Sequence, residues 1–525
     1  MSDDHNRRPR YGVTRAQIAA AAQRRAAGDW SGACAVAGIG SEVDLPAVAR
    51  EAGAEVAAAV EDDLRHLVPD LLRWHVLRLQ YHSARVDWRF GVATSLTRHV
   101  VPLSEHGERA LYLAAHGHGG PFSVRSASAA GPSRFVLRFG EPPGAARPMS
   151  LAGLRELWDA RETPGLLARC GGRTRLPFFA PDGARQEGTG PEAVTERAWR
   201  LFEAGRPEDA LREAGIDLDL ADSAQGWHFT VGPSLQPAAA TLASAARRAA
   251  ARAGVPAVWS RGGRNRILWF DRLDVPDRLD VPGRLDVPGR LDVPDRPRVR
   301  IVDAVRAQQE PAVELPLTEV FWPEDFRDLV DGRIAPSDLH PLVAAALFPS
   351  LPLDDVTGPE PMAVPGPTRV RCGGAWHVAE FRDGVLAGPH SPAEFDREKA
   401  MLALGGPPPA GCAGAHVAWR GGPSRAPRVF NAVRRELMRR AGAGEADTVE
   451  AMLDAGVDPH CRDGDGRTLL HLLACLVPDE AAMRLLPRLL AAGLDPRTED
   501  RHGQTPAAVA ERAGAHPSLV AALRF

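Results

Sequence analysis

The feature that most constrains this chain is a turn sequence near its C-terminus that occurs twice. Residues 455–474 read AGVDPHCRDGDGRTLLHLLA, and residues 492–510 read AGLDPRTEDRHGQTPAAVA. The residues shared at a spacing of 37 are Gly456/Gly493, Asp458/Asp495, Pro459/Pro496, Gly466/Gly503 and Thr468/Thr505. Each copy joins a glycine-bearing turn to a helix start. A unit of this size cannot bury an apolar face alone, so we expect the units to stack.

The helix start at residues 468–474, TLLHLLA, resembles the T-P-L-H-x-A motif of the ankyrin repeat family, with Leu469 in the proline position. The next unit, at 505–510, keeps the threonine and proline but has alanines in place of leucine and histidine, which suits a terminal repeat. A first repeat begins near Phe430, and its two helices meet at Gly444. The resemblance covers 430–525 and implies an all-α stack of about three ankyrin repeats.

The resemblance also implies where a protein partner would bind, because recognition in such stacks falls on variable residues of the turn tips and inner helices. The predicted partner-binding residues are His460, Arg462, Asp463, Asp465, Arg497, Glu499, Arg501 and His502. Their mixed charge suits a polar protein surface and argues against DNA, whose phosphates would favour basic residues alone. We expect the acids also to form the turns, and His471 to hydrogen-bond within the helix-turn framework.

Histidines and cysteines in the same stretch leave a metal-site alternative open. His471 and Cys475 stand four residues apart on the expected helix, and His460 and Cys461 precede them. Together they could bind zinc. The ankyrin pattern accounts for His471 without a metal, so we predict no metal and no cofactor here.

The length of the chain, 525 residues, exceeds what one hydrophobic core supports, so two or three domains are expected. A formal net charge of −3 gives no overall field that would hold nucleic acid or an acidic membrane. The only lysine is Lys399, a bias typical of a GC-rich genome. Because Lys399 follows no glycine-rich loop or strand, a phosphate-binding P-loop and a protein kinase are both excluded.

The N-terminal residues and the cysteines favour a cytoplasmic protein. Arg24 and Arg25 interrupt the only alanine run near the N-terminus, so no secretory signal is expected. No apolar run is long enough to span a membrane. The cysteines are sparse and form no C-x-x-C pair, which fits reduced thiols.

The rest of the chain alternates between helical and strand-like patterns and predicts an α+β body. We expect a disordered arm at 1–13, an α+β domain at 14–185 and another at 191–405. In the first domain, helices are predicted from Thr14 to Leu67, and strand patterns follow after about residue 109. A Pro- and Gly-rich linker at 406–428 precedes the ankyrin-like tail, which we expect to dock on the body.

Two internal sequence similarities suggest that the body is a duplicated unit. Residues 26–39 match 203–216 at an offset of 177, and a Cys-Gly-Gly turn at Cys170 recurs at Cys372, an offset of 202. The low-complexity segment 272–295, four copies of an R-L-D-V-P-x hexad, would nearly account for the difference. The duplication stays open, since short Ala and Gly matches are common in this composition. The hexads read as an insertion in a surface loop, because regularly spaced proline disfavours helix and strand.

Three other patterns suggest chemistry, and each has a structural explanation that we favour. His116 and His118 could begin a metal site or an oxyanion-hole turn, but no further ligand spacing and no G-x-S-x-G motif is found. Cys170 or Cys372 could be a nucleophile, with His377 the only nearby histidine, but a small buried cysteine is favoured. The basic N-terminal arm lacks a recognition helix after it.

Two functions of different class remain. The first is a non-catalytic, cytoplasmic interaction protein whose ankyrin-like tail binds a protein partner. The second is an enzyme of unrecognised class in the α+β body, such as a hydrolase, with the tail as a targeting module. The lack of a recognisable nucleophile elbow, P-loop, dinucleotide fingerprint or metal motif favours the first function.

Overall fold

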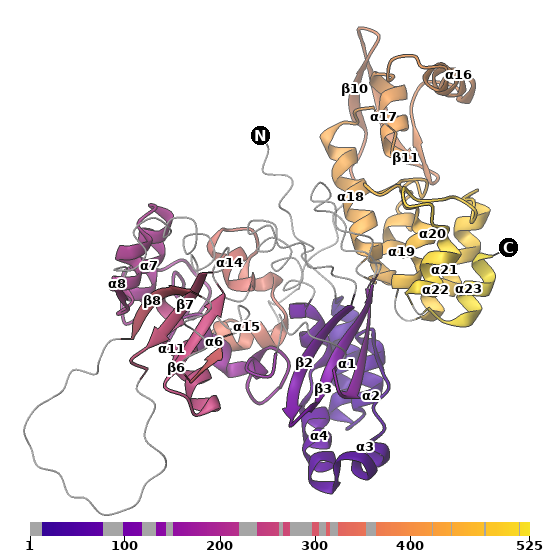
Figure 1. Ribbon diagram of the computed structural model, residues 1–525. Helices are drawn as coiled ribbons and strands as arrows, with labels where there is room; N and C mark the ends of the chain where they lie inside the picture. Colours follow the sequence, from indigo (N-terminus) through magenta and orange to yellow (C-terminus); the bar gives the residue numbers. More distant parts are fainter. Residues whose placement is uncertain are drawn as a thin grey trace, which may run out of the picture.

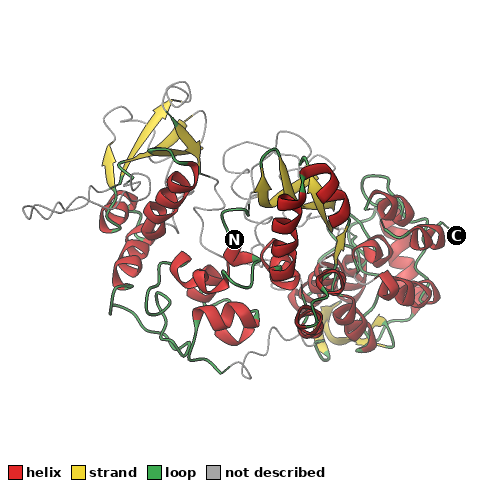
Figure 2. Cartoon of the chain, turned by 90° about the horizontal axis from the view of Figure 1, so that it is seen from below, coloured by secondary structure: helices red, strands yellow, loops and turns green. Residues whose placement is uncertain are grey.

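The computed structural model describes residues 13–76, 98–117, 133–142, 151–219, 239–261, 266–273, 297–303, 311–315, 324–352, 364–422, 424–442, 444–476, 479–513 and 515–524. Among these residues the chain forms a mixed α+β structure with three sheets (Figure 1). Figure 2 shows strand groups separated by helices and loops, with helices gathered around the C-terminus. The expected arm at 1–13 lies outside the described residues except for Val13.

The first unit begins with helices and continues into a four-stranded sheet. Its helices are α1 (Arg15–Ala26), α2 (Trp30–Val36), α3 (Leu45–Ala52) and α4 (Ala54–His66). Its strands are β1 (Ile39–Ser41), β2 (Arg98–His106), β3 (Arg109–Gly117) and β4 (Ser133–Gly140). Thr14 begins the helical region as predicted, and it caps α1 in a capping box with Gln17. Gly53, with φ of 96°, divides the long helical pattern into α3 and α4.

The second unit has a five-stranded sheet. Its helices are α7 (Ala193–Glu203), α8 (Pro207–Glu213) and α11 (Ala239–Ala253). Its strands are β5 (Asp217–Asp219), β6 (Ala257–Arg261), β7 (Arg266–Asp271), β8 (Arg298–Asp303) and β9 (Ala312–Glu314). Leu242, Ala246, Leu268 and Phe270 belong to the core between α11 and the sheet. Leu273, inside the first hexad, also joins this core. The hexads from 274 onward lie outside the described residues.

Both sheets are connected in the same way. In each, two helices lead into a short strand, and that strand pairs in parallel with the last strand of an antiparallel three-stranded meander. The strand orders are β1-β4-β3-β2 and β5-β8-β7-β6, and β9 extends the second sheet beside β6. The Cys-Gly-Gly turns do not correspond, however. Cys170 caps a helix, α6 (Leu166–Arg169), whereas Cys372 ends a strand, so the 202-residue offset joins unlike elements.

Helices that follow the second sheet in sequence pack into the hydrophobic core of the first unit. Helices α14 (Glu324–Val330) and α15 (Pro341–Leu347) follow the second sheet in sequence, but they join the core of the first unit. Short 3-10 turns at Arg155–Leu157, Thr163–Gly165 and Pro336–Asp338 complete this region. A buried hydrogen bond from Trp74 Nε1 to Asp325 Oδ2, 2.9 Å long, joins segments 251 residues apart. The first core therefore depends on residues from both predicted domains.

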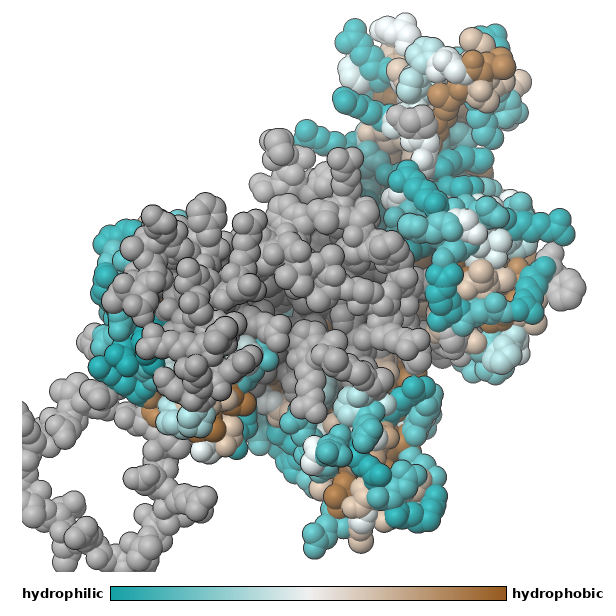
Figure 3. Space-filling model, viewed as in Figure 1, coloured by the Kyte–Doolittle hydropathy of each residue, from teal (hydrophilic) through white to brown (hydrophobic). Residues whose placement is uncertain are grey.

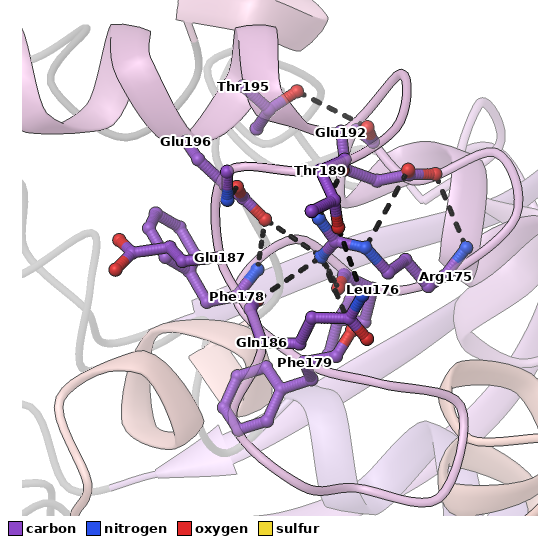
Figure 4. Close-up of polar contacts among 12 residues, drawn as sticks. Arg175, Leu176, Phe178, Phe179, Gln186, Glu187, Thr189, Glu192, Thr195 and Glu196 are labelled. Carbon is purple, nitrogen blue, oxygen red and sulfur yellow. Dashed lines mark hydrogen bonds and ion pairs between the residues drawn. The ribbon is translucent and has the colours of Figure 1, made fainter.

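A buried arginine fastens the loop between the units (Figure 4). Arg175 lies 2.8 Å from Glu196 of α7 and donates to the carbonyl oxygens of Leu176, Phe179, Gln186 and Thr189. Glu192 accepts from three successive backbone amides, at 173–175. Burial alone would raise the pKa of Glu192, but these backbone bonds hold its pKa at about 2. The loop is thereby held by charge-assisted hydrogen bonds.

The third sheet belongs to a small lobe, residues 364–422, which we call the hairpin lobe. It holds β10 (Thr368–Cys372), β11 (Ala375–Arg382), β12 (Val385–Ala387), α16 (Pro392–Ala403) and α17 (Gly411–Trp419). The strands form an antiparallel meander. Helix α17 lies within the expected linker 406–428, and its Cys412 and Trp419 are buried. This part of the linker is therefore folded structure.

The C-terminal residues form three helix pairs, which we call the helix-pair stack. The pairs are α18 (Arg428–Gly442) with α19 (Ala446–Asp454), α20 (Leu469–Leu472) with α21 (Asp479–Ala491), and α22 (Pro506–Arg512) with α23 (Pro517–Leu523). A 3-10 turn, Leu473–Cys475, extends α20. The first helices of successive pairs contact one another, as do the second helices. Leu485, Leu486 and Leu489 are buried in the core of the stack, while Leu490 is 38% exposed. This core includes the hairpin lobe and no described residue before 364.

Candidate functional site

The two recurring turns connect consecutive helix pairs and are built by their acids. Asp463 accepts hydrogen bonds from the backbone of Asp465 and Arg467, both 2.9 Å long. In the next turn Asp500 accepts from the backbone of His502 and Gln504 in the same pattern. The recurring glycines, Gly466 and Gly503, have φ of 79° and 70°, which favours glycine. The acids therefore act as turn formers, as the sequence analysis expects.

His471 connects one helix pair to the next. Its Nδ1 accepts from the Thr468 backbone N–H at 3.1 Å, so Nε2 carries the proton and donates to the carbonyl oxygen of Gln504 at 3.0 Å. The Thr468 hydroxyl lies 2.9 Å from the same Nδ1. Burial lowers the pKa of His471 to about 4. This histidine is thus a neutral structural residue, as expected from the sequence.

The predicted partner-binding residues fall into two groups. Arg497, Glu499, Arg501 and His502, on the second turn, are exposed. On the first turn Asp465 is 8% exposed and lies 3.5 Å from the buried Arg467. Asp463 is only partly exposed. The first-turn acids are therefore directed into the fold, because the turn backbone and Arg467 need them, and they contribute little surface.

The hairpin lobe engages the remaining first-turn residues. The Arg462 backbone N–H donates to the Trp419 carbonyl oxygen, at 3.4 Å. His460 Nδ1 lies 2.9 Å from the buried Asp458, which also accepts from the Leu386 backbone at 3.3 Å. Both His460 and Arg462 are half-buried. The second turn is consequently the part of the predicted surface that is freely exposed.

Aromatic packing strengthens the contact between the lobe and the stack. The Phe381 ring lies 4.8 Å from Trp419 and 5.5 Å from Phe430 of α18, measured between ring centroids. Trp419 Nε1 also donates to the Asp458 carbonyl oxygen at 3.2 Å. The lobe therefore covers the first helix pair and its turn, as a capping unit does in a repeat stack. Figure 3 shows apolar side chains on the outer part of this lobe.

A buried histidine–carboxylate pair is the strongest catalytic candidate in the described part of the body. His340 Nε2 lies 3.0 Å from Asp70, and His340 lines a cavity of about 320 Å³ together with Trp74 and Arg25. However, His340 Nδ1 accepts from the Leu342 backbone N–H at 3.2 Å. Both ring nitrogens are engaged, so neither can take a proton from a substrate. His340 thereby caps α15, and Asp70 fixes the orientation of its ring.

The other candidates in the body are placed as follows. His116 lies on β3, opposite Arg134 of β4, and His118 lies outside the described residues. Cys170 is fully buried, and burial raises its thiol pKa well above the usual range, as expected for an inert structural cysteine. Cys372 lies instead among other polar side chains.

One cluster in the hairpin lobe, formed by Cys372, His377, His390 and Cys412, was not predicted from the sequence. The sequence suggested Cys372 and His377 only as a nucleophile and its partner, and it suggested no role for His390 or Cys412. Burial and the neighbouring Cys372 raise the pKa of the Cys412 thiol to about 11. Two Cys and two His within 41 residues were the available signal, but their spacing matches no common zinc motif.

Comparisons with known proteins add no identity. No protein family and no curated protein sequence matches this chain. Among the described residues, no helix combines the length and apolar character needed to cross a membrane.

Proposed function

We propose that the protein is a non-catalytic, cytoplasmic interaction protein whose helix-pair stack is a set of ankyrin repeats that binds a protein partner. The single observation that carries this proposal is the bridging geometry of His471, which joins a threonine-capped helix start to the turn of the following unit. The recurring turns, the contacts between successive helix pairs and the capping lobe all suit a scaffold that presents a surface. The six cysteines all lie in the described part of the chain and are thiols that form no disulfide there, which fits a reducing compartment.

The partner surface that we propose is the second turn, with Arg497, Glu499, Arg501 and His502. These side chains are exposed, and their backbone is fixed by Asp495 and Asp500. A rigid tip that carries both signs of charge selects a partner with complementary charges. It gives DNA phosphates no uniformly basic surface. We expect no nucleic acid and no membrane as partners.

We also propose that the two α+β units descend from one duplicated unit. The support is the shared connectivity, with two helices, a short strand and a meander that pairs in parallel with that strand. The offset of 177 residues aligns the first of these elements, where β1 follows α2 and β5 follows α8. The proposal concerns the sheets and the helices before them, and it leaves out the Cys-Gly-Gly turns.

The test uses the full chain as bait in a pull-down, followed by identification of the captured protein and a binding titration. The variant Arg497→Ala/Arg501→Ala should reduce partner affinity by about tenfold or more, because it removes two exposed charges from the turn. The matched control is Arg484→Ala/Arg488→Ala, which removes two exposed arginines from α21 that pair with Glu450 and Asp454. Equal affinity of both variants and the wild type would refute the second turn as the binding surface.

A further inference from the structure

Four potential metal ligands of the hairpin lobe converge from three separate places in the sequence. Cys372 ends β10 and His377 lies on β11, whose register pairs Cys372 with Ala375 and Val370 with His377. Because alternate residues of a strand share a face, Cys372 and His377 point to the same side of the hairpin. His390 comes from the loop before α16, and Cys412 from the first turn of α17.

The distances among the four ligand atoms fit one tetrahedral ion. His377 Nδ1 lies 3.0 Å from His390 Nε2, Cys372 Sγ lies 3.5 Å from His390 Nε2, and Cys412 Sγ lies 3.7 Å from His377 Nδ1. All four atoms lie within 4.8 Å of one another. Zinc bonds to sulfur and nitrogen in a tetrahedron separate the ligand atoms by about 3.3–3.8 Å. The separations of 3.5 and 3.7 Å fall within this range, and the His377–His390 separation of 3.0 Å is slightly shorter.

The backbone around the cluster permits this close approach. Gly411, directly before Cys412, has φ of 63°, and a Cβ atom at this position would lie 2.8 Å from Cys372 Sγ. Any other residue at 411 would push the two cysteines apart. Gly373 and Gly374 make the tight turn that returns β11 beside β10. The glycines therefore allow the four side chains to meet.

The carboxylate of Glu394 lies behind His390, on the side of the ring that faces away from the cluster. His390 turns Nε2 toward the cluster, and its Nδ1 lies 3.6 Å from Glu394 Oε1. A carboxylate behind the outer nitrogen of a metal-bound histidine fixes the ring and its tautomer. Glu394 is itself held by the Ser391 backbone N–H at 2.7 Å, in the capping box of α16. This arrangement favours Nε2 of His390 as a ligand nitrogen with a free lone pair.

Outside α17, the hairpin lobe buries few apolar side chains. Helix α16 buries no residue; Met401 on it is 55% exposed, and Leu404, which follows its last residue, is 83% exposed. The buried apolar side chains of the three strands are Val370, Ala379 and Leu386. Small units with so little buried surface commonly need a metal or disulfides to fold. The cysteines of the lobe are free, which leaves a metal as the available crosslink.

We propose that Cys372, His377, His390 and Cys412 bind one zinc ion in a closed, structural Cys2His2 site. Thiolate and imidazole ligands in a tetrahedron select zinc over the harder cations magnesium and calcium. Binding would release the two thiol protons to solvent, and two thiolates then neutralise the charge of Zn²⁺. Four protein ligands leave no open position, so the ion would have a structural role and no catalytic one. It would fasten β10, β11, the loop before α16 and α17 into one cap on the helix-pair stack.

The first test measures metal content in the full chain. Protein purified under reducing conditions, without chelator, should contain about one zinc ion per chain by elemental mass spectrometry. The variant Cys372→Ser/Cys412→Ser should lose this zinc. The matched control Cys34→Ser/Cys475→Ser, which changes two buried cysteines outside the cluster, should keep it. Retention of zinc in the Cys372/Cys412 variant would overturn the site.

The second test does not depend on whether a variant folds. Zinc is removed from the wild-type chain with a chelator, and Co²⁺ is added as a spectroscopic probe. We expect one equivalent to give the visible bands of tetrahedral cobalt and a thiolate-to-cobalt charge-transfer band. A wild-type chain that neither copurifies with zinc nor gives these bands would refute the proposal. So would a Cys372–Cys412 disulfide under reducing conditions, seen as an intact mass two hydrogens short and located by peptide mapping.

Discussion

The helix-pair stack and the hairpin lobe share one hydrophobic core, yet different physical forces hold them. In the stack, each helix pair buries leucine and alanine side chains against its neighbours, and the same turn is rebuilt 37 residues later. In the lobe, a long helix buries nothing, and two cysteines and two histidines meet at one point. Repetition therefore stabilises the first through summed packing, whereas the second would depend on the proposed zinc ion and on the aromatic contacts that join it to the stack.

Removal of the metal should give the largest difference between the hairpin lobe and the helix-pair stack. Zinc binding contributes about 10–16 kcal/mol in small zinc units, which is more than any side-chain packing change here. After chelation of the full chain, we expect backbone amides of 368–419 to lose hydrogen-exchange protection, while those of 479–524 keep it. The measurement is hydrogen exchange followed by mass spectrometry. Equal loss in both segments would mean that the stack also needs the metal, and no loss in either would mean that the metal is dispensable.

The body offers a third kind of support, a buried ion pair without repeat or metal. Arg175→Met should destabilise the body by about 3–5 kcal/mol, because it leaves the buried Glu196 carboxylate without its cation. We expect this loss of stability in the unfolding transition of the body, measured by calorimetry or denaturant titration. The matched control is the exposed pair variant Arg197→Met, whose partner Glu213 is solvated and whose cost should stay below about 1 kcal/mol. Similar losses of stability in both variants would mean that the buried Arg175–Glu196 ion pair contributes no more than an exposed one.

A substitution at His471 measures how much its two hydrogen bonds stabilise the helix-pair stack. His471→Ala removes the acceptor for the Thr468 amide and the donor for Gln504, and each group left unpaired costs about 1–3 kcal/mol. The exposed His502→Ala is the control and should change stability by less than about 0.5 kcal/mol. Denaturant unfolding of the full chain, followed through a probe in the stack, gives both values.

The same histidine predicts a pH dependence. Its folded pKa, about 4, lies below its ordinary value of 6.5, so the unfolded chain binds the proton more readily. The stability that depends on neutral His471 should be fully present above pH 6.5 and should fall as the pH drops toward 4. This decline should disappear in His471→Ala. If the variant and the wild type lose stability equally over this range, other groups control the acid response.

How far the sequence predicts this molecule depends on whether its contacts are local. Thr14, Thr468 and Thr505 cap the helices that follow them, since a cap needs only its next three residues. The acids of the turns likewise bond to backbone two to four residues away. The spacing of the repeats and the α+β character of the body follow from such local patterns.

The rest depends on contacts between distant segments. His340 meets Asp70 across 270 residues, and Leu386 donates to Asp458 across 72. The four residues of the proposed zinc site lie at irregular spacings, and only the hairpin register and the approach of α17 bring them together. The Cys-Gly-Gly turns show the converse, because the same letters at Cys170 and Cys372 occur at a helix end and at a strand end.

The hexad segment shows whether a repeated sequence stabilises the protein when it has no core. Its deletion should give the smallest change in stability. The stack repeats and is buried, whereas in the hexads we expect repetition without a core, because regularly spaced proline removes backbone donors. Leu273 is an exception, since it is 4% exposed within the second core, so the deletion must spare it. Removal of 275–295 should shift the melting temperature by a few degrees at most, because shortening the loop between β7 and β8 from 26 residues to 5 is a little more than two halvings, each of which changes the closure free energy by only about 0.6 kcal/mol. The control deletion, 272–295, also removes Leu273 and should cost an additional 2–4 kcal/mol or so, as loss of a buried leucine does. If the shorter deletion proves as damaging as the longer one, the hexads pack against the body. Repetition would then stabilise both regions.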